Sequence, residues 1–461
     1  MEHLSVTNAQ QRILGCVHKL DIESVSLERS VGRVLADDVR ANRDLPPYDV
    51  SAMDGYALRS ADLAKIPATL EVIEDIKAGD MPRNTVQAGQ CARIMTGAPL
   101  PQGADAVIRV EDTQVVSEGS PLLNPLDETT SHSTKLPKTA AKSMVIPQAG
   151  RAQRGGRSQA NEKSNFRNWV QIDVAVKSGN DIRLRGEGMR NGDVVLTAGA
   201  EITPGVTGVL ATVKQSQVQV YRRPRVAILS TGNELEDIDD PVDPDKIPNS
   251  NSYALMAQVQ ALGIEPDLLG IARDDPAELE EYLQRGLRFD VLLVSGGTSV
   301  GVHDYVRPII ESLGVQMKFW RVAMKPGHPV AFGTTESCKF FGLPGNPVSS
   351  MVCFEQFVAP ALRRMMGHQR LFRRTIAARL MHSIKHQPGR TEFVRVTLAK
   401  EAGGYSATST GAQGSGMLLS MARADGLLVI PAESTGLAAD SMVTVQLLDG
   451  TVYQDDAGFS E

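Results

Sequence analysis

The chain has 461 residues, which is too many for one hydrophobic core and indicates several domains. Its 48 Lys and Arg against 54 Asp and Glu give a formal charge of −6, so it lacks the basic excess that non-specific nucleic-acid binding needs. The sequence also lacks an apolar signal-peptide centre, a run near the roughly 18 apolar residues of a membrane span, and a C-x-x-C metal spacing among its four cysteines. We therefore expect a globular cytoplasmic protein with reduced thiols.

The amino-terminal region mixes helical and extended patterns. Residues 8–20 and 28–39 carry apolar side chains at helical spacing and predict two helices, with a short extended piece between them. Two adjacent prolines then exclude a helix from the stretch DLPPYDVSAMDGYAL, and strand-like runs alternate with Gly and Pro from residue 69 to 110. This pattern predicts a small β-rich domain.

Residues 119–168 differ from everything around them. They contain eight basic and three acidic residues, many Ser, Thr, Gln, Gly and Pro, and almost no periodic apolar pattern. Such a composition predicts a disordered insertion, because it offers too little apolar surface for a core. An anion-binding or RNA-binding arm is the alternative for its arginines, but basic low-complexity loops are more often simply solvated.

Strands and helices alternate between residues 225 and 366, which is typical of a doubly wound α/β sheet. The expected strands are residues 226–229, 268–271, 291–294 and 339–343. The expected helices lie near residues 253–262, 276–287 and 304–313, and a long helix begins near Val348. Alternating apolar runs with Gly-rich turns beyond residue 373 predict a carboxyl-terminal β-barrel or sandwich.

Three of the expected strands end in loops rich in Gly, Ser, Thr and Asn. These are Ser230-Thr231-Gly232-Asn233-Glu234, Ser295-Gly296-Gly297-Thr298-Ser299 and Leu343-Pro344-Gly345-Asn346-Pro347. The loops that leave the carboxyl ends of parallel strands lie along one edge of the sheet, where ligands bind. Each loop leads toward a helical pattern, so backbone N–H groups and a helix N-terminus can bind an anion. We predict a ligand with a phosphate or another oxyanion; the alternative for any single loop is a tight turn that needs glycine.

Several carboxylates fall on the same expected edge. Asp275 precedes Pro276, with Glu278 three residues further on, so it is explained as a helix N-cap in a capping box. Asp274 has no such structural role, and a carboxylate near phosphates commonly binds Mg²⁺ or positions water. Glu234 and Asp304 are expected nearby, although for each of these three carboxylates a cap or a surface charge remains the alternative.

Six sequence blocks resemble those of a known family and occur in the same order. They are DLPPYDVSAMDGYAL, IMTGAPLPQGADAVIRVEDT, LSTGNEL, SGGTSVGVHDYV, MKPGHP and GLPGNPVS. In this order they are similar to the molybdopterin molybdenumtransferases, which are homologous to the carboxyl-terminal region of gephyrin. The resemblance implies an α/β multidomain chain: an elongated α+β linking and dimerisation domain (1–44 and 170–222), a small β-rich domain (45–169), a molybdopterin-binding doubly wound domain (223–371) and a carboxyl-terminal β domain (372–461).

The resemblance also implies an activity. Molybdenum from molybdate would be inserted into adenylylated molybdopterin with release of AMP, dependent on Mg²⁺, in a homodimer with shared active sites. The molybdopterin adenylyltransferase is a candidate partner, whereas nucleic acid and membrane are not expected. Two alternatives remain. One is a related enzyme, a molybdopterin adenylyltransferase, because a Gly-Gly-Thr loop on this type of α/β domain could also bind nucleotide and pterin; the additional domains on both sides argue against it. A gephyrin-like scaffold without catalysis is the second, and the acidic residues argue against it.

Carried over position by position, the resemblance assigns roles to individual residues. Asp54 and Thr96 would come from the β-rich domain, and Glu234, Asp274 and Asp304 from the doubly wound domain, with Asp274 and Asp304 as the Mg²⁺ ligands. The three loops, from Ser230, Ser295 and Pro344 onward, would bind the cofactor precursor. Lys325 and the segment from Pro344 to Ser349 would bind molybdate, since a cation and helix N-terminal N–H groups attract an oxyanion.

Three positions depart from the family pattern. His328 stands where many relatives have a second lysine, so a weaker or pH-sensitive oxyanion site is expected. Gly188 stands where relatives commonly have Asp, and Asn249 where some have Asp. None of these changes removes Asp54, Glu234, Asp274 or Asp304.

Overall fold

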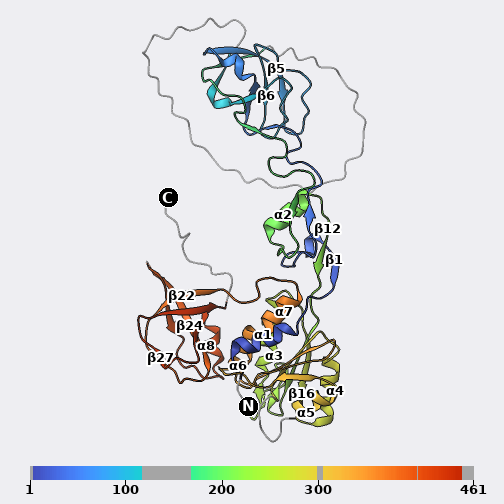
Figure 1. Cartoon of the computed structure of the whole chain (residues 1–461), viewed down its shortest axis with the longest axis vertical. Coiled ribbons are helices and arrows are strands. Elements are labelled where there is room, and N and C mark those ends of the chain that lie inside the picture. Colours follow the sequence, from blue (N-terminus) through green and yellow to red (C-terminus); the bar gives the residue numbers. More distant parts are fainter. Residues whose placement is uncertain (1–3, 117–167, 298–304, 402, 449–461) are drawn as a thin grey trace. The chain divides into compact units, whose positions relative to one another are not determined.

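The computed structural model describes residues 4–116, 168–297, 305–401 and 403–448 (Figure 1). The chain divides into two compact units, Met1–Arg40 with Val194–Glu461, and Ala41–Asp193. The expected insertion lies outside the described residues, apart from Asn168, which begins a strand. No helix in the described ranges is long and apolar enough to cross a membrane.

The smaller unit is built on a mixed six-stranded sheet in the order β7-β4-β6-β5-β9-β8. The strands are β4 (Gly55–Leu58), β5 (Ala68–Ile76), β6 (Gln90–Ile94), β7 (Ala106–Arg109), β8 (Thr113–Val116) and β9 (Asn168–Ile172). Tyr56, Leu58 and Val170 lie in its core. Strand β9 pairs with β5 and β8, so the segment after residue 170, expected to begin the linking domain, continues this sheet instead. A short ladder joins β3 (Val50–Ser51) to β10 (Ile182–Arg183).

The amino-terminal segment of the larger unit corrects one expectation. Helix α1 (Val6–Gly15) is present, although it begins before residue 8 and ends before residue 20, the bounds expected for it. The helix expected at residues 28–39 is wrong. Only a 3₁₀ turn, η1 (Leu27–Arg29), forms, because Gly32 takes φ 76° and the chain continues extended. Val34 and Leu35 bury their side chains through bridges to Glu201 and Val220. The apolar residues that recur here at helical spacing are therefore buried by extended segments that pair with distant parts of the chain, and not by one face of a helix.

The same region forms two small ladders around a short helix. Strand β1 (Ile22–Ser26) pairs with β12 (Gln217–Tyr221), and β2 (Val39–Arg40) with β11 (Val194–Leu196), beside helix α2 (Pro204–Thr212). Thr203 caps α2 by accepting from the Val206 N–H, and Pro204 occupies its first turn, where the missing N–H costs nothing.

The doubly wound sheet is present, as expected. Its six strands run β16-β13-β17-β21-β20-β18, parallel from β16 to β21 and antiparallel beyond. The strands are β13 (Val226–Thr231), β16 (Asp267–Ala272), β17 (Val291–Ser295), β18 (Gln316–Phe319), β20 (Ala331–Thr334) and β21 (Lys339–Leu343). Two-residue strands β14 (Leu235–Glu236) and β15 (Ile247–Pro248) form a separate ladder.

Helices cover both faces of this sheet. Alternate strand residues point to opposite faces: Ile228 and Leu293 pack with α3 (Ser250–Gln260), whereas Leu229 and Leu292 pack with α4 (Pro276–Gly286) and α5 (Val306–Ser312). A strand buried on both faces reads as a continuous apolar run, which explains why these strands could be located from the sequence.

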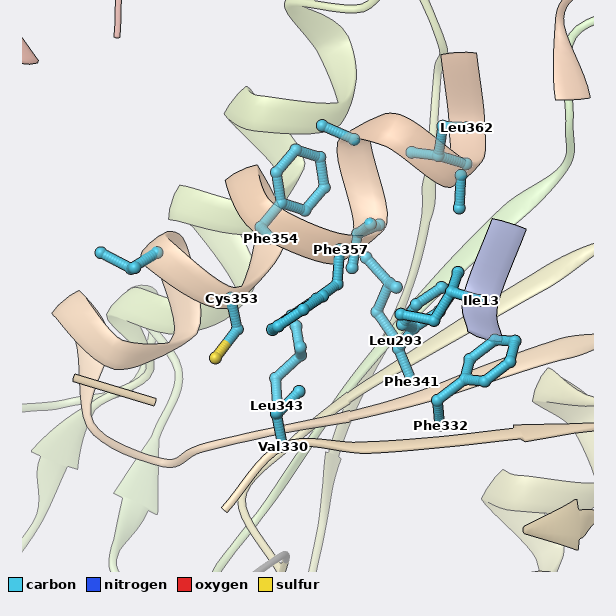
Figure 2. Close-up of a cluster of buried hydrophobic side chains, with 14 of the residues drawn as sticks. Ile13, Leu293, Val330, Phe332, Phe341, Leu343, Cys353, Phe354, Phe357 and Leu362 are labelled. Carbon is cyan, nitrogen blue, oxygen red and sulfur yellow. The ribbon is translucent and has the colours of Figure 1, made fainter. Parts of the chain in front are cut away.

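The long helix after β21 is interrupted. It consists of α6 (Pro347–Cys353), a π turn (Phe354–Val358) and α7 (Ala359–Met365). Pro360 lacks the N–H of a regular helix, and the π turn lies directly before it. Figure 2 shows Phe357 directed from this helix toward Leu343, and burying such a phenylalanine contributes roughly 1.5–3 kcal/mol.

The carboxyl-terminal region is a closed five-stranded barrel, so of the two expected architectures the barrel is the one observed. Strand β24 pairs with both β25 and β26, and β22 and β28 complete the ring. The strands are β22 (Thr375–Leu380), β24 (Thr391–Glu401), β25 (Gly404–Ser409), β26 (Gly426–Ile430) and β28 (Met442–Leu447), with β23 (Ile384–Lys385), β27 (Gly436–Leu437) and helix α8 (Leu418–Ala422) outside the ring. Barrel residues Phe393 and Leu427 join the core beneath α6 and α7.

Candidate active site

The carboxyl ends of three neighbouring parallel strands meet as the sequence predicted. Ser230 of β13 is in register with Ser295 of β17, which is in register with Leu343 of β21. Beyond them lies a cavity of about 730 Å³. The expected residues that line it are Thr231, Gly232, Glu234, Asp274, Ser295, Gly296, Gly297, Pro344, Gly345, Asn346 and Pro347. Thr298, Ser299 and Asp304 lie outside the described residues.

The second loop packs tightly against the first. Gly296 and Gly297 have φ of 93° and 60°, and a Cβ at Gly296 would lie 2.5 Å from the Thr231 carbonyl oxygen. A Cβ at Gly297 would lie 2.4 Å from Val306 Cγ2. Glycine is therefore required by both conformation and space, and the tight turn also brings backbone to the cavity.

The first loop differs from expectation, because the short strand β14 follows it instead of a helix. The Glu234 carboxylate lies directly over Gly232, where a Cβ would be 2.5 Å from Oε2. Asn233 and Asp274 are joined reciprocally: the Asn233 N–H donates to Asp274 Oδ2 at 3.4 Å, and the Asp274 N–H to Asn233 Oδ1 at 3.2 Å. Asp274 thus has a local structural role that the sequence did not reveal.

Asp275 caps α4 as predicted, accepting from the N–H groups of Ala277 and Glu278. The capping box itself is wrong, since the Glu278 carboxylate accepts from the Arg273 N–H. Glu278 therefore secures the turn that carries Asp274. This arrangement separates the two neighbours, with Asp275 serving the helix and Asp274 facing the cavity.

The third loop leads directly into α6, as predicted. Asn346 is the N-cap residue, and the Val348 N–H donates to the Ser415 carbonyl oxygen of the barrel at 3.0 Å. Gly416, from the same barrel loop, lines the cavity although the sequence reading did not include it. The Gly-rich motif Gly414-Ser415-Gly416 is the sequence feature that could have indicated this loop as part of the cavity.

Two expected ligand-binding residues are placed elsewhere. The Ser230 hydroxyl is buried and hydrogen-bonded to Asn249 Oδ1 at 2.8 Å and to Ser252 Oγ at 2.9 Å. Ser349 is buried within α6. Neither residue lines the cavity, so each supports the loops from behind.

Comparisons with known proteins agree with this geometry. Family models match the MoeA N-terminal region (domains I and II) at residues 4–213, a probable molybdopterin-binding domain at 227–364 and the MoeA C-terminal region (domain IV) at 377–448. A molybdopterin molybdenumtransferase of Nostoc is 34% identical over 455 residues, covering 96% of this chain and 93% of the relative. The chain belongs to the MoeA family.

Further relatives extend the match. The molybdopterin molybdenumtransferase of Bacillus subtilis is 31% identical over 450 residues, covering 96% of this chain and 94% of the relative. The crystal structure of the molybdopterin biosynthesis MoeA protein of Pyrococcus horikoshii OT3 matches with a TM-score of 0.74 and 28% identity, covering 97% of this chain and all of the other. The multidomain fold is thus shared by MoeA proteins of distant organisms.

The lysine of the MoeA-type KPG turn is paired. Strand β19 (Met324–Lys325) is in parallel register with β24, and Lys325 Nζ lies 2.8 Å from Glu392 Oε1. Glu392 is buried, and its Oε2 lies 2.7 Å from His386 Nδ1. Lys325 does not line the cavity and its side chain is 58% exposed. Lys325 could be recognised from the sequence, but the carboxylate of Glu392 that orients it could not.

The three departures from the MoeA pattern have local explanations. His328 Nδ1 lies 2.7 Å from the Val322 carbonyl oxygen, which fixes the ring. A Cβ at Gly188 would lie 3.1 Å from the Leu45 carbonyl oxygen, so the position is tight for any side chain. Asn249 caps α3 by accepting from the Ser252 N–H.

Within the smaller unit, Asp54 and Thr96 are brought together. Asp54 Oδ1 accepts from both the N–H and the hydroxyl of Thr96, each at 2.7 Å. These two hydrogen bonds, the backbone one first, lower the pKa of the Asp54 carboxyl below its usual range. The carboxylate is therefore held ionised in a fixed orientation.

In the described ranges, no three His, Cys, Asp or Glu side chains are grouped closely enough to form a complete metal site. Glu234 and Asp274 are the carboxylates that line the cavity there. Mg²⁺ commonly uses one or two carboxylates and takes its remaining ligands from phosphates and water. The donor set therefore fits Mg²⁺ bound together with a phosphate ligand.

Proposed function

We propose that this chain inserts molybdenum from molybdate into adenylylated molybdopterin with release of AMP, as a molybdopterin molybdenumtransferase. The observation that supports this most is the cavity at the carboxyl edge of the parallel sheet, where two Gly-rich loops and the start of α6 meet two carboxylates. The names of the relatives supply the chemistry, and this geometry suits its anionic substrates.

The loops would bind and orient the phosphates. The Gly296 and Val348 N–H groups already donate to the carbonyl oxygens of Leu343 and Ser415. We therefore propose the backbone N–H groups of Gly297, Gly345 and Asn346 as the donors for phosphate and molybdate oxygens. The Glu234 and Asp274 carboxylates would repel those anions unless a cation or a donor group intervenes. They are therefore suited to Mg²⁺ or to positioning water, and Asp304 is proposed as a further metal ligand.

Mg²⁺, when bound, would offset the repulsion between phosphate oxygens and make AMP a better leaving group. In this step a water oxygen would bond to the phosphorus of molybdopterin, the bond from that phosphorus to the bridging oxygen would break, and the bridging oxygen would leave with AMP; the released proton would pass to solvent. The residues of the chain hold the two phosphate groups in a fixed geometry during that step. Asp54, held by Thr96, is proposed to contribute a further carboxylate that is ionised at neutral pH, and Lys325 a cation for molybdate.

We also propose a cytoplasmic homodimer in which each active site combines Asp54 of one subunit with Asp274 of the other, with the molybdopterin adenylyltransferase as a candidate supplier of substrate. Complementation tests this. If Asp54→Ala and Asp274→Ala are inactive alone, refolding them together at random makes about half the dimers mixed, each with one intact site, so roughly a quarter of wild-type activity should return. No recovery in confirmed mixed dimers would reject shared sites.

The activity itself is tested by incubating the protein with adenylylated molybdopterin, molybdate and Mg²⁺. We expect AMP and a cofactor that activates an apo-molybdoenzyme. Substrate binding without AMP release would instead favour a scaffold. Formation of adenylylated molybdopterin from ATP would favour the adenylyltransferase.

A further inference from the structure

Asn251, in the first turn of α3, joins the second and third loops of the cavity. Its Nδ2 lies 2.7 Å from Ser295 Oγ and 2.7 Å from the Gly345 carbonyl oxygen. A carbonyl oxygen can only accept a hydrogen bond, so the NH₂ end of the amide must face Gly345. The orientation of this side chain is thereby fixed, and one donor group satisfies acceptors on two loops.

Both contacts change what the loops present to an anion. The Gly345 carbonyl dipole lies at the cavity, where an unpaired oxygen would repel a phosphate or molybdate, and the amide N–H offsets it. Ser295 Oγ accepts the other N–H, which leaves its own hydroxyl hydrogen to be donated. Asn251 therefore makes the site more favourable for an oxyanion in two ways: it pairs the Gly345 carbonyl oxygen and it leaves the Ser295 hydroxyl free to donate.

The fold does not require asparagine at this position. The cap of α3 is already provided by Asn249, whose side chain accepts from the Ser252 N–H. Moreover, Asn251 Oδ1 is buried with no hydrogen-bond partner, an arrangement that costs about 1–3 kcal/mol. The side chain is therefore held in place by its two Nδ2 contacts to the cavity loops and not by any contribution to the helix.

We propose that Asn251 is a positioning residue of the anion site: it orients the Ser295 hydroxyl as a donor and neutralises the Gly345 carbonyl oxygen. This inference rests on the proposed function, in that the anion is taken to be the phosphate or molybdate of the reaction. It also assigns to the site a residue that contacts two loops, at Ser295 and Gly345, which lie 44 and 94 positions after Asn251 in the sequence.

Asn251→Asp is the decisive variant, because it keeps the shape but replaces the NH₂ group with a carboxylate oxygen. A carboxylate in the first turn of α3 is favourable for the helix, so the fold should be kept. At the site it would face the Gly345 oxygen and the anion. We expect KM for adenylylated molybdopterin to rise on the order of tenfold or more, with a smaller rise for Asn251→Ala and none for Gln260→Ala in the last turn of the same helix.

Two readouts separate positioning from a merely structural role. The Asn251→Asp defect should shrink as pH falls toward protonation of the introduced carboxyl, whereas the Asn251→Ala defect should not depend on pH. Calorimetric binding of inorganic phosphate, which needs no turnover, should follow the order wild type, Ala, Asp. Equal phosphate affinity in all three folded proteins would overturn the inference. A different outcome separates the two proposals. If the wild type binds phosphate but releases no AMP, and the variants bind phosphate more weakly, the proposed function is rejected and this inference stands.

Discussion

The cavity and the barrel both contain buried polar side chains, but they differ in whether those side chains have hydrogen-bond partners within the protein. In the barrel, Arg395 is 1% exposed, and its guanidinium donates to Ser420 Oγ and to the carbonyl oxygens of Ala412, Gln413 and Gly414. At the cavity, Thr231 Oγ1 and Asn251 Oδ1 are buried without a partner. Polar groups that the protein satisfies internally fix its shape. His386 Nε2 in the barrel region is also buried without a partner, so an unsatisfied atom points to a ligand only where its residue also lines a cavity, as Thr231 and Asn251 do.

The largest effect should come from breaking the satisfied network. Arg395→Met removes hydrogen bonds to three loop carbonyls, each worth about 1 kcal/mol, so the barrel should lose about 3 kcal/mol of its free energy of unfolding. Arg379→Met is the matched control, because its ion pairs with Glu401 and Asp440 are exposed and therefore contribute little to stability. Urea denaturation measures both, and equal losses would contradict the comparison.

Asp274→Asn should leave stability nearly unchanged and lower turnover about a hundredfold, since it removes charge from a cavity carboxylate while keeping its size. The neighbouring Asp275→Asn is a sharp control, because asparagine caps a helix as well as aspartate. We expect wild-type turnover in the control. Rates of AMP release and melting temperatures of both variants decide the matter, and wild-type turnover in Asp274→Asn would reduce Asp274 to a surface charge.

A smaller effect is expected from Gly232→Ala. Its Cβ would occupy the space of the Glu234 carboxylate, which must then move, and the φ of 146° disfavours a side chain. Turnover should fall on the order of tenfold through misplacement of that carboxylate. Gly208→Ala in helix α2 has open space around the new methyl and should be neutral or slightly stabilising. An unchanged rate in Gly232→Ala would show that Glu234 has no fixed catalytic position.

The contrast between the two regions also explains how far the sequence could be read. The run Val291–Ser295 is apolar at every position but the last because helices cover both faces, so the strand and the loop after it could be placed. The helix expected at residues 28–39 failed because bridges to distant segments buried Val34 and Leu35. Local periodicity does not distinguish these two ways of burying a side chain.

The site shows the same limit. Loops directly after strands were predictable, because parallel strands end at a common edge. Asn251 was not, since its significance depends on Ser295 and Gly345, which only the fold brings together. Glu392 was missed for the same reason: its register with Lys325 is a property of two strands distant in sequence. Pairings across the chain are what composition and spacing leave undetermined.

The smallest expected effect concerns Asp54. Like that of Arg395 in the barrel, its side chain has hydrogen-bond partners within the protein. Hydrogen bonds from Thr96 favour the ionised form, so the folded pKa lies below the ordinary 3.8. Their contribution to stability is therefore present above that value and is lost as pH falls through the lower folded pKa. A carboxyl-carbon NMR titration should show no change in the Asp54 resonance between pH 5 and 8 and a midpoint below 3.8. Thr96→Val, which removes the hydroxyl and keeps the N–H, should raise the midpoint, whereas Thr96→Ser, which keeps both donors, should not. A titration midpoint above 5 for Asp54 in the wild type would instead show that the Thr96 hydrogen bonds do not stabilise the ionised carboxylate.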